Sequence, residues 1–288
     1  MRLIEWSPYW RAYRSIASQA ARICLARRGS ASLRGLRWSF GPFGVKDLFT
    51  LVNLMGGVVG IHFVLTGQLA WAGYALLLGY LLGDSLDGAV ARLTHTSNRF
   101  GGEFDTATDH FVQAIVPGII AYAVYARAGH PTLAIVLLSA VVGCATIRQA
   151  MFSVATLGDP LMYCGLPRTI SGYASMAFVL SRWFTVHGDI AIPIGAILVP
   201  LLALMGLLPI PYMTHKGVRR MQLYVKFLVA GFLVTPVAAL FVAREYTFDI
   251  LFVWTAGYAA FGWFPLTAEE KRSFFERYRR WFADLSRA

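Results

Sequence analysis

The sequence predicts an all-α, polytopic integral membrane protein. The chain of 288 residues is 57% hydrophobic and only 14% charged, and its apolar runs are longer than those of a soluble domain of this size. Eight of these runs have about 20 residues each, enough to cross a bilayer as a helix. We therefore expect a bundle of about eight transmembrane helices, with an amphipathic interfacial helix at each end of the chain.

The net charge of +11 does not indicate nucleic-acid binding, because no recognition motif accompanies it. The basic residues lie instead in short segments beside the apolar runs, as in membrane proteins. The three cysteines are odd in number and have no CxxC spacing, which argues against a disulfide framework and a zinc site. We expect them to be small buried apolar residues.

Residues 1–46 are expected to form a cytoplasmic unit that consists of a helix and a linker. Within residues 2–28, apolar side chains recur at helical spacing and arginines occupy the other faces, which is typical of a helix on an anionic membrane surface. Docking on the protein's own body would need the same apolar stripe, so both interpretations remain open. Residues 29–44 are rich in Ser, Gly, Arg and Pro and predict a linker.

Residues 47–264 form the predicted transmembrane domain, in which the fifth span has the weakest pattern. Lys and Arg gather before the first span, in the turn at 92–103, around Arg168, at 215–220 and after the last span. All these places lie on one side of the membrane, so we expect that side and both termini to be cytoplasmic. The eight spans are 47–66, 70–92, 104–127, 131–154, 168–187, 190–209, 223–243 and 246–264.

Residues 265–288 predict a second interfacial helix, also cytoplasmic. Thr267 and Glu270 form a capping box, and the aromatic residues that follow share one helical face while most arginines lie elsewhere. We expect this helix to anchor the protein to the membrane.

Four aspartates are the most informative residues of the chain. Asp84 and Asp87 share a helical face with Gly88, Ala91 and Arg92, and Asp105 and Asp109 are stacked one turn apart at the start of the next span. A polar turn joins the two helices, so the four carboxylates can converge at the cytoplasmic border. Carboxylates beside hydrocarbon are unfavourable and are expected to be functional.

Such an array predicts bound metal, because divalent cations relieve the repulsion between clustered carboxylates. Two ions that share carboxylates are a recurring way to polarise a phosphoryl group. Gly88 and Gly101 allow a ligand to approach the backbone, and Arg92 can pair with a phosphate. Helix capping and ion pairs with Arg92 or Arg99 would explain a single aspartate, but they do not explain the whole set.

This spacing resembles the signature of the CDP-alcohol phosphotransferases at all eight fixed positions. The resemblance implies a membrane enzyme in which an acceptor hydroxyl attacks a CDP-linked lipid such as CDP-diacylglycerol and expels CMP. It implies two Mg²⁺ or Mn²⁺ ions held by Asp84, Asp87, Asp105 and Asp109, with Asp109 as general base. It also implies a homodimer in the cell (inner) membrane with its active site facing the cytoplasm. The implied CDP-lipid-binding residues are Thr50, Asn53, Asp87, Gly88, Ala91, Arg92 and Gly101.

Further stretches are similar to the phosphatidylserine and archaetidylserine synthase branch, which implies L-serine as the acceptor. They are the first span, the segment around Arg148 and the turn that ends at Pro167. Arg148 and Arg168 are the predicted acceptor-binding residues, although Arg148 could instead pair with a site carboxylate or reach the interface. The chain departs from the branch at Met151, at Arg168 and in the segment HFVQAIVP after Asp109.

Other functions remain open at this stage. Another acceptor, such as inositol phosphate, glycerol phosphate or a further small alcohol, would use the same aspartates. A divalent-cation transporter would also place aspartates in its spans, but it would need them near the bilayer midplane rather than at a border turn. A lipid-binding scaffold would not need the full acidic set.

Overall fold

The computed structural model describes residues 43–84, 98–154, 157, 162–214 and 223–285. The chain divides into two units, residues 1–39 and 40–288, and the described residues belong to the second. The predicted N-terminal interfacial helix and the linker residues up to 42 therefore lie outside the described residues.

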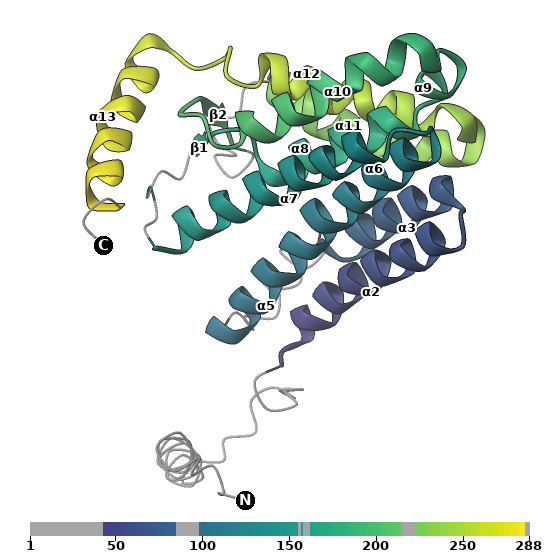
Figure 1. Cartoon of the computed structure of the whole chain (residues 1–288). Coiled ribbons are helices and arrows are strands. Elements are labelled where there is room, and N and C mark those ends of the chain that lie inside the picture. The colour runs from purple at the N-terminus through teal and green to yellow at the C-terminus, as the bar shows by residue number, and fades with distance from the viewer. Residues whose placement is uncertain (1–42, 85–97, 155–156, 158–161, 215–222, 286–288) are drawn as a thin grey trace, which may run out of the picture. The chain divides into compact units, whose positions relative to one another are not determined.

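The described part of the second unit is a helical bundle (Figure 1). Each of the eight predicted spans is mostly helical where it is described, which confirms the all-α fold class. The helices of the bundle are α2 (Val45–Leu65), α3 (Leu69–Leu82), α5 (Arg99–His110), α6 (Val116–Arg127), α7 (Pro131–Val154), α8 (Arg168–Leu180), α9 (Arg182–Val186), α10 (Gly188–Met205), α11 (Leu223–Val242) and α12 (Thr247–Phe261).

Four of the described helical segments are long and apolar enough to cross a membrane. They are α2, the continuous segment Arg99–Arg127, α7 and α10, and shorter apolar helices occupy Leu69–Leu82 and Ala230–Val242. Large apolar side chains such as Leu51, Ile135 and Ile197 are exposed on α2, α7 and α10. Water would disfavour so much exposed apolar surface, whereas lipid tails accept it. The protein is an integral membrane protein.

Helix α8 occupies the centre of the bundle. Every residue from Ser171 to Val179 is buried, and α6, α10 and α12 pack around the helix. The expected single span 168–187 is divided at Ser181, which has an extended backbone and whose Oγ accepts a hydrogen bond from the N–H of Phe184 at the start of α9. This correction explains the weak apolar pattern of the fifth span, because a helix enclosed by protein does not need to cover the thickness of the bilayer.

One end of the bundle is made by the short loops that the sequence predicts to lie opposite the basic segments. Arg127 donates from Nη1 to the carbonyl of Gly67 at 2.8 Å, which joins the turns after α2 and α6. Gly67 and Gly129 adopt φ values of 86°, which suit glycine. The guanidinium of Arg244 lies 4.1 Å from the ring centroid of Trp71, so the loop before α12 reaches the same end.

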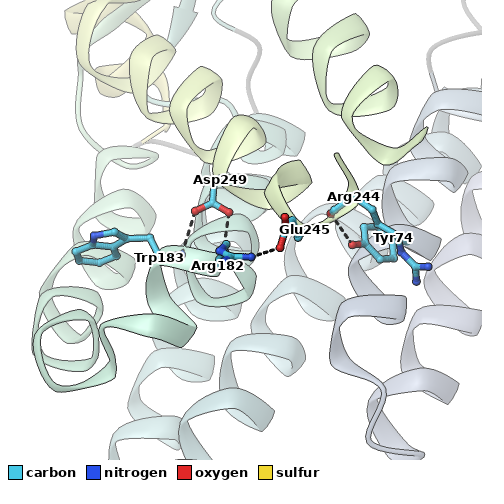
Figure 2. A network of polar contacts seen from close by, with 6 residues as sticks. All are labelled: Tyr74, Arg182, Trp183, Arg244, Glu245 and Asp249. Carbon is cyan, nitrogen blue, oxygen red and sulfur yellow. Dashed lines mark hydrogen bonds and ion pairs between the residues drawn. The ribbon is translucent and has the colours of Figure 1, made fainter. Parts of the chain in front are cut away.

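A network of polar contacts fixes that end (Figure 2). The Asp249 carboxylate accepts hydrogen bonds from the backbone N–H groups of Arg182 and Trp183 at 2.9 and 3.0 Å. Arg182 also forms an ion pair with Glu245, while Tyr74 donates to the carbonyl of Arg244 at 3.0 Å. These contacts connect α3, α9 and the 3₁₀ turn η3 (Arg244–Tyr246) with α12. We call the six residues drawn in Figure 2 the loop-end clamp.

The opposite end carries two elements that the apolar pattern does not predict. Strands β1 (Met162–Cys164) and β2 (Pro211–Met213) pair antiparallel, with Tyr163 opposite Tyr212. Gly165, at φ 69°, turns the chain from β1 into α8.

Helix α13 (Ala268–Leu285) is the predicted C-terminal amphipathic helix, and it begins with the expected Thr267–Glu270 capping box. Part of its aromatic face is used within the protein, since Phe274 is fully buried and the Trp281 ring stacks on Phe152 of α7 at 5.3 Å. Phe275 and Phe282 remain exposed. Its membrane-anchoring role stays a prediction.

A candidate metal and nucleotide-lipid site

Three of the four predicted metal ligands converge. Asp84 lies just after the end of α3, and Asp105 and Asp109 are one turn apart on α5. One carboxylate oxygen from each lies within 4.8 Å of the other two. Helix α5 starts at Asn98, whose side chain accepts a hydrogen bond from the N–H of Gly101 at 2.6 Å. This cap fixes the start of α5, and the four-residue spacing places both of its carboxylates on the same face.

Asp87, Gly88, Ala91 and Arg92 lie outside the described residues. The roles proposed for them therefore rest on the sequence alone.

Asp109 has two different oxygen environments. Oδ2 lies 3.5 Å from Nη2 of Arg168, whereas Oδ1 is buried without a hydrogen-bond partner. A buried, unpaired carboxylate oxygen is strongly unfavourable unless a ligand completes it. The donor set of three clustered carboxylates fits a hard divalent cation, which binds oxygen ligands.

Arg168 also donates from Nη1 to Oε1 of Gln149 at 2.7 Å, which holds the guanidinium beside the carboxylates. Its position at the first residue of α8 follows directly from the turn at Gly165. The structure thus brings this predicted acceptor residue to the carboxylate cluster.

Arg148 is placed differently. Its Nη1 donates to the carbonyls of Cys164 and Gly206, and its guanidinium lies 4.8 Å from the Phe152 ring centroid. These contacts tie the end of β1 to the end of α10. Arg148 and Arg168 nevertheless line one small cavity together with Gln113 and Ser171. The acceptor-binding role of Arg148 stays a prediction.

The chain between α5 and α6 forms a π-helical turn, η2 (Phe111–Ile115). The side chain of Gln113 in this turn accepts a hydrogen bond from Thr169 of α8 at 2.6 Å. A Cβ at Gly172 would collide with the Gln113 carbonyl, so only glycine permits this close approach of α8. The π turn therefore fixes α8, and with it Arg168, against Asp109.

Thr50 and Asn53, the predicted nucleotide-facing residues of α2, are both 1% exposed. Thr50 Oγ1 and Asn53 Oδ1 have no hydrogen-bond partner. The Cβ that a side chain at Gly83 would add lies 2.6 Å from Asn53, so this glycine lets the end of α3 close onto α2. Asp84 follows immediately and is thereby carried toward α2.

Sequence reasoning missed a buried ion pair beside this site. Lys46 and Asp47 are 8% and 2% exposed, and Nζ lies 3.1 Å from Oδ1, although the alignment is not that of a hydrogen bond. Both side chains fill the space that a Cβ at Gly101 would occupy. At the start of an apolar span, these charges resemble ordinary interfacial residues, so their position gives no signal of burial.

Cys164 is not a nucleophile at this site. Burial raises the pKa of its thiol to about 11, so the thiol is neutral at physiological pH. Its side chain packs with Met162, Leu266 and Phe274 instead.

Several proteins of known name are similar to part of the chain. A protein named CDP-diacylglycerol–serine O-phosphatidyltransferase from Helicobacter pylori is 34% identical over 123 residues, which are 42% of this chain and 51% of that protein. The Saccharomyces cerevisiae protein of the same name is 34% identical over 158 residues, covering 50% of this chain and 54% of the yeast protein. A Methanocaldococcus jannaschii protein, also of that name, is 26% identical over 158 residues, covering 54% and 70%.

The match to the first two relatives spans about half of their length. The sequence profile of the CDP-alcohol phosphatidyltransferase family covers more of this chain, residues 44–229. That range contains α2, the three clustered aspartates, the π turn and Arg168. The chain belongs to the CDP-alcohol phosphatidyltransferase family.

Proposed function

We propose that the protein transfers a phosphatidyl group from CDP-diacylglycerol to the hydroxyl of L-serine and releases CMP. The observation that carries this proposal is the convergence of Asp84, Asp105 and Asp109 beside Arg168 in a chain of this family. The names of the relatives support serine as the acceptor.

Asp84, Asp105 and Asp109 would hold two Mg²⁺ or Mn²⁺ ions, with Asp87 as the fourth ligand. When bound, such ions polarise the phosphoryl group and neutralise the charge that develops on the leaving CMP. The clustering of the oxygens within 4.8 Å of one another supports this assignment.

Asp109 acts as the general base. A hydroxyl is a poor nucleophile at neutral pH, and a carboxylate within hydrogen-bond reach accepts its proton during attack. A bond forms between the serine oxygen and the phosphorus that carries the diacylglycerol, while the bond from that phosphorus to the CMP oxygen breaks. Arg168 beside Oδ2 holds the Asp109 carboxylate in a fixed orientation.

Arg168 also recognises the acceptor. A guanidinium pairs with a carboxylate in a defined geometry, so an amino acid held there has its hydroxyl within reach of Asp109. Arg148, which lines the same cavity, contributes to this recognition. Thr50, Asn53, Gly88, Ala91, Arg92 and Gly101 hold the CDP-lipid.

We further propose that the protein lies in the cell (inner) membrane as a homodimer, with the carboxylate end of the bundle and both termini in the cytoplasm. The short, weakly basic loops gather at the opposite end through Gly67, Arg127 and Arg244, which agrees with the charge distribution along the sequence.

The test is CMP release by purified protein with CDP-diacylglycerol, Mg²⁺ or Mn²⁺ and a panel of acceptors. We expect release with L-serine, and weaker or no release with glycerol phosphate and inositol phosphate. A clear preference for either phosphate would replace serine as the acceptor. Background release with every member of the panel would contradict the transferase.

An Arg168→Gln variant tests the acceptor assignment. We expect the KM for serine to rise roughly 10-fold or more, while the KM for CDP-diacylglycerol changes by less than about twofold. Arg182→Gln, in the loop-end clamp, is the matched control and should change neither. Equal changes in both KM values for Arg168→Gln would mean that the arginine acts on the site as a whole.

A further inference from the structure

Lys46 packs against Gly101 of α5, one helical turn before Asp105. A Cβ at Gly101 would lie 2.7 Å from its Nζ, so glycine alone leaves room for the ammonium at this point of α5. Gly101 is one helical turn before Asp105 on the same face. Gly101, which the sequence predicts to make room for a ligand, therefore also makes room for the ammonium group of Lys46.

Helix stability does not explain this lysine. Lys46 is in the first turn of α2, where the helix dipole disfavours a cation, and burial removes most of its hydration. Asp47 is its one charged partner among the described residues, and Oδ2 of that carboxylate already accepts from the N–H of Gly44 at 2.7 Å. An ammonium has three N–H donors, so Lys46 retains the capacity to bind an anion.

Contacts along α2 show which of its residues lie beside the α5 carboxylates. Lys46 meets Gly101, Gly57 meets Val112, and Gly60 meets Val116. The residue offsets are 101 − 46 = 55, 112 − 57 = 55 and 116 − 60 = 56, so α2 runs parallel to α5–η2–α6 in a register that shifts by one residue after η2. This register brings Thr50 level with Asp105, and Asn53 level with Thr108.

Lys46, Thr50 and Asn53 share one face of α2, within about 60° of arc. The oxygens Thr50 Oγ1 and Asn53 Oδ1 are buried and lack partners. A face with a cation at its open end and two unpaired acceptors further in fits a ligand with an anionic group followed by hydrogen-bond donors. A cytidine phosphate has this order of groups, because its ribose hydroxyls and cytosine amino group are donors.

We propose that Lys46 binds a phosphate of the CDP-lipid, while Thr50 and Asn53 accept hydrogen bonds from the nucleoside. This inference rests on the proposed function and adds to it a phosphate-binding residue on α2. The site would then use two cations with different tasks, Lys46 for the nucleotide and Arg168 for the acceptor.

The test compares Lys46→Met with the parent protein, both full-length in nanodiscs with Mg²⁺. We expect the Kd for CDP and the KM for CDP-diacylglycerol to rise roughly 10- to 100-fold, the range of a lost charged hydrogen bond. The KM for the acceptor should stay within about twofold. The inhibition constant of cytidine, which has no phosphate, should not change. Equal weakening of cytidine and CDP, or an unchanged Kd for CDP, would overturn the proposal.

Two control variants separate phosphate binding from structure. Lys271→Met removes an equivalent charge from α13 and should bind CDP like the parent. Lys46→Met/Asp47→Asn removes both charges of the ion pair but keeps an oxygen for the Gly44 N–H. It should bind CDP as weakly as Lys46→Met. Recovery of CDP binding in the double variant would show that Lys46 only neutralises Asp47, and would overturn the proposal.

This design also separates the two hypotheses. Parent protein that binds CDP but releases no CMP with any acceptor would contradict the proposed transferase, while the comparison of Kd values would still decide the role of Lys46.

Discussion

Asp109 differs from Asp84 and Asp105 in its immediate surroundings. It has an arginine at one carboxylate oxygen and a buried, unpaired second oxygen. A carboxylate held in this way can keep one oxygen oriented while the other accepts a proton or binds a ligand. This asymmetry favours Asp109, among the three clustered aspartates, as the group that changes its protonation during turnover.

Replacement of Asp109 by Asn should abolish most of the activity without loss of the fold. The amide cannot accept the hydroxyl proton, so we expect kcat to fall roughly 10²- to 10⁴-fold. Steady-state CMP release and the thermal unfolding midpoint are the two measurements. Asp189→Asn, at an exposed position of α10, is the control. Full turnover by Asp109→Asn would show that another group is the base.

At the scale of single residues, the sequence predicts that the carboxylates converge, but it does not predict the position of Lys46. Asp105 and Asp109 are four residues apart, and local helical geometry alone stacks them. The partners Lys46 and Gly101 are 55 residues apart, since 101 − 46 = 55. Their contact depends on the packing register of two helices, which no local spacing encodes.

Among the elements, the π turn η2 does most to position the site. It projects the Gln113 carbonyl against Gly172, and the Gln113–Thr169 hydrogen bond reinforces the contact with α8. π turns interrupt α-helices most often at functional positions. Here the turn lies directly after Asp109 and supports the helix that carries Arg168.

A Gly172→Ala variant should therefore be destabilised and nearly inactive, because the new methyl group has to displace α8 from η2. Gly143→Ala in α7 is the matched control, since no atom lies within 4 Å of its added Cβ. We expect the control to be neutral or stabilised by up to about 1 kcal/mol. Thermal unfolding in nanodiscs and CMP release report both effects. Equal behaviour of the two variants would contradict the close contact.

Disruption of the loop-end clamp should affect stability and not substrate binding. Asp249→Ala removes the acceptor for two backbone N–H groups at the start of α9, and loss of such a cap costs about 0.5–2 kcal/mol. Thermal unfolding should reveal the loss, while both KM values stay within about twofold. Asp284→Ala on the exposed side of α13 should leave stability unchanged. A selective rise in the serine KM would connect the clamp to the site.

The span pattern predicts each described membrane helix, because about 20 apolar residues in succession are a strong signal. It misses the division at Ser181 and the β1–β2 pair. Strands of three residues are too short to show alternation. Helix α8 is surrounded by protein and not by lipid, so its sequence does not need an apolar run as long as the bilayer is thick.

On the scale of the whole molecule, the carboxylate cluster and the loop-end clamp lie at opposite ends of the bundle. The carboxylates, Lys46 and the β1–β2 pair lie toward the end of the bundle where α5 begins and α7 ends, whereas the clamp and tight turns fix the opposite loops. Glycine contacts such as Gly56 with Gly79 hold α2 and α3 backbones close together. The contacts that fix the loop end therefore help to hold the helices that carry the carboxylates in place.

Removal of divalent metal should abolish CMP release without unfolding the bundle. The apolar core is formed by side chains such as Leu76, Ile120 and Met176, which bind no metal. We expect a chelator to reduce CMP release to background and Mg²⁺ or Mn²⁺ to restore it, with unchanged helical circular dichroism. Undiminished release in excess chelator would contradict a metal-dependent reaction.

The π turn between Asp109 and α6 has a consequence for changes in chain length. A π turn contains one residue more than an α-turn. Deletion of one residue from 111–115 would therefore leave a regular helix that is locally well formed. It would nevertheless rotate the carboxylate face by about 100° relative to the buried face of α6. In this segment, a change in the number of residues should therefore impair activity more than a conservative substitution of one side chain.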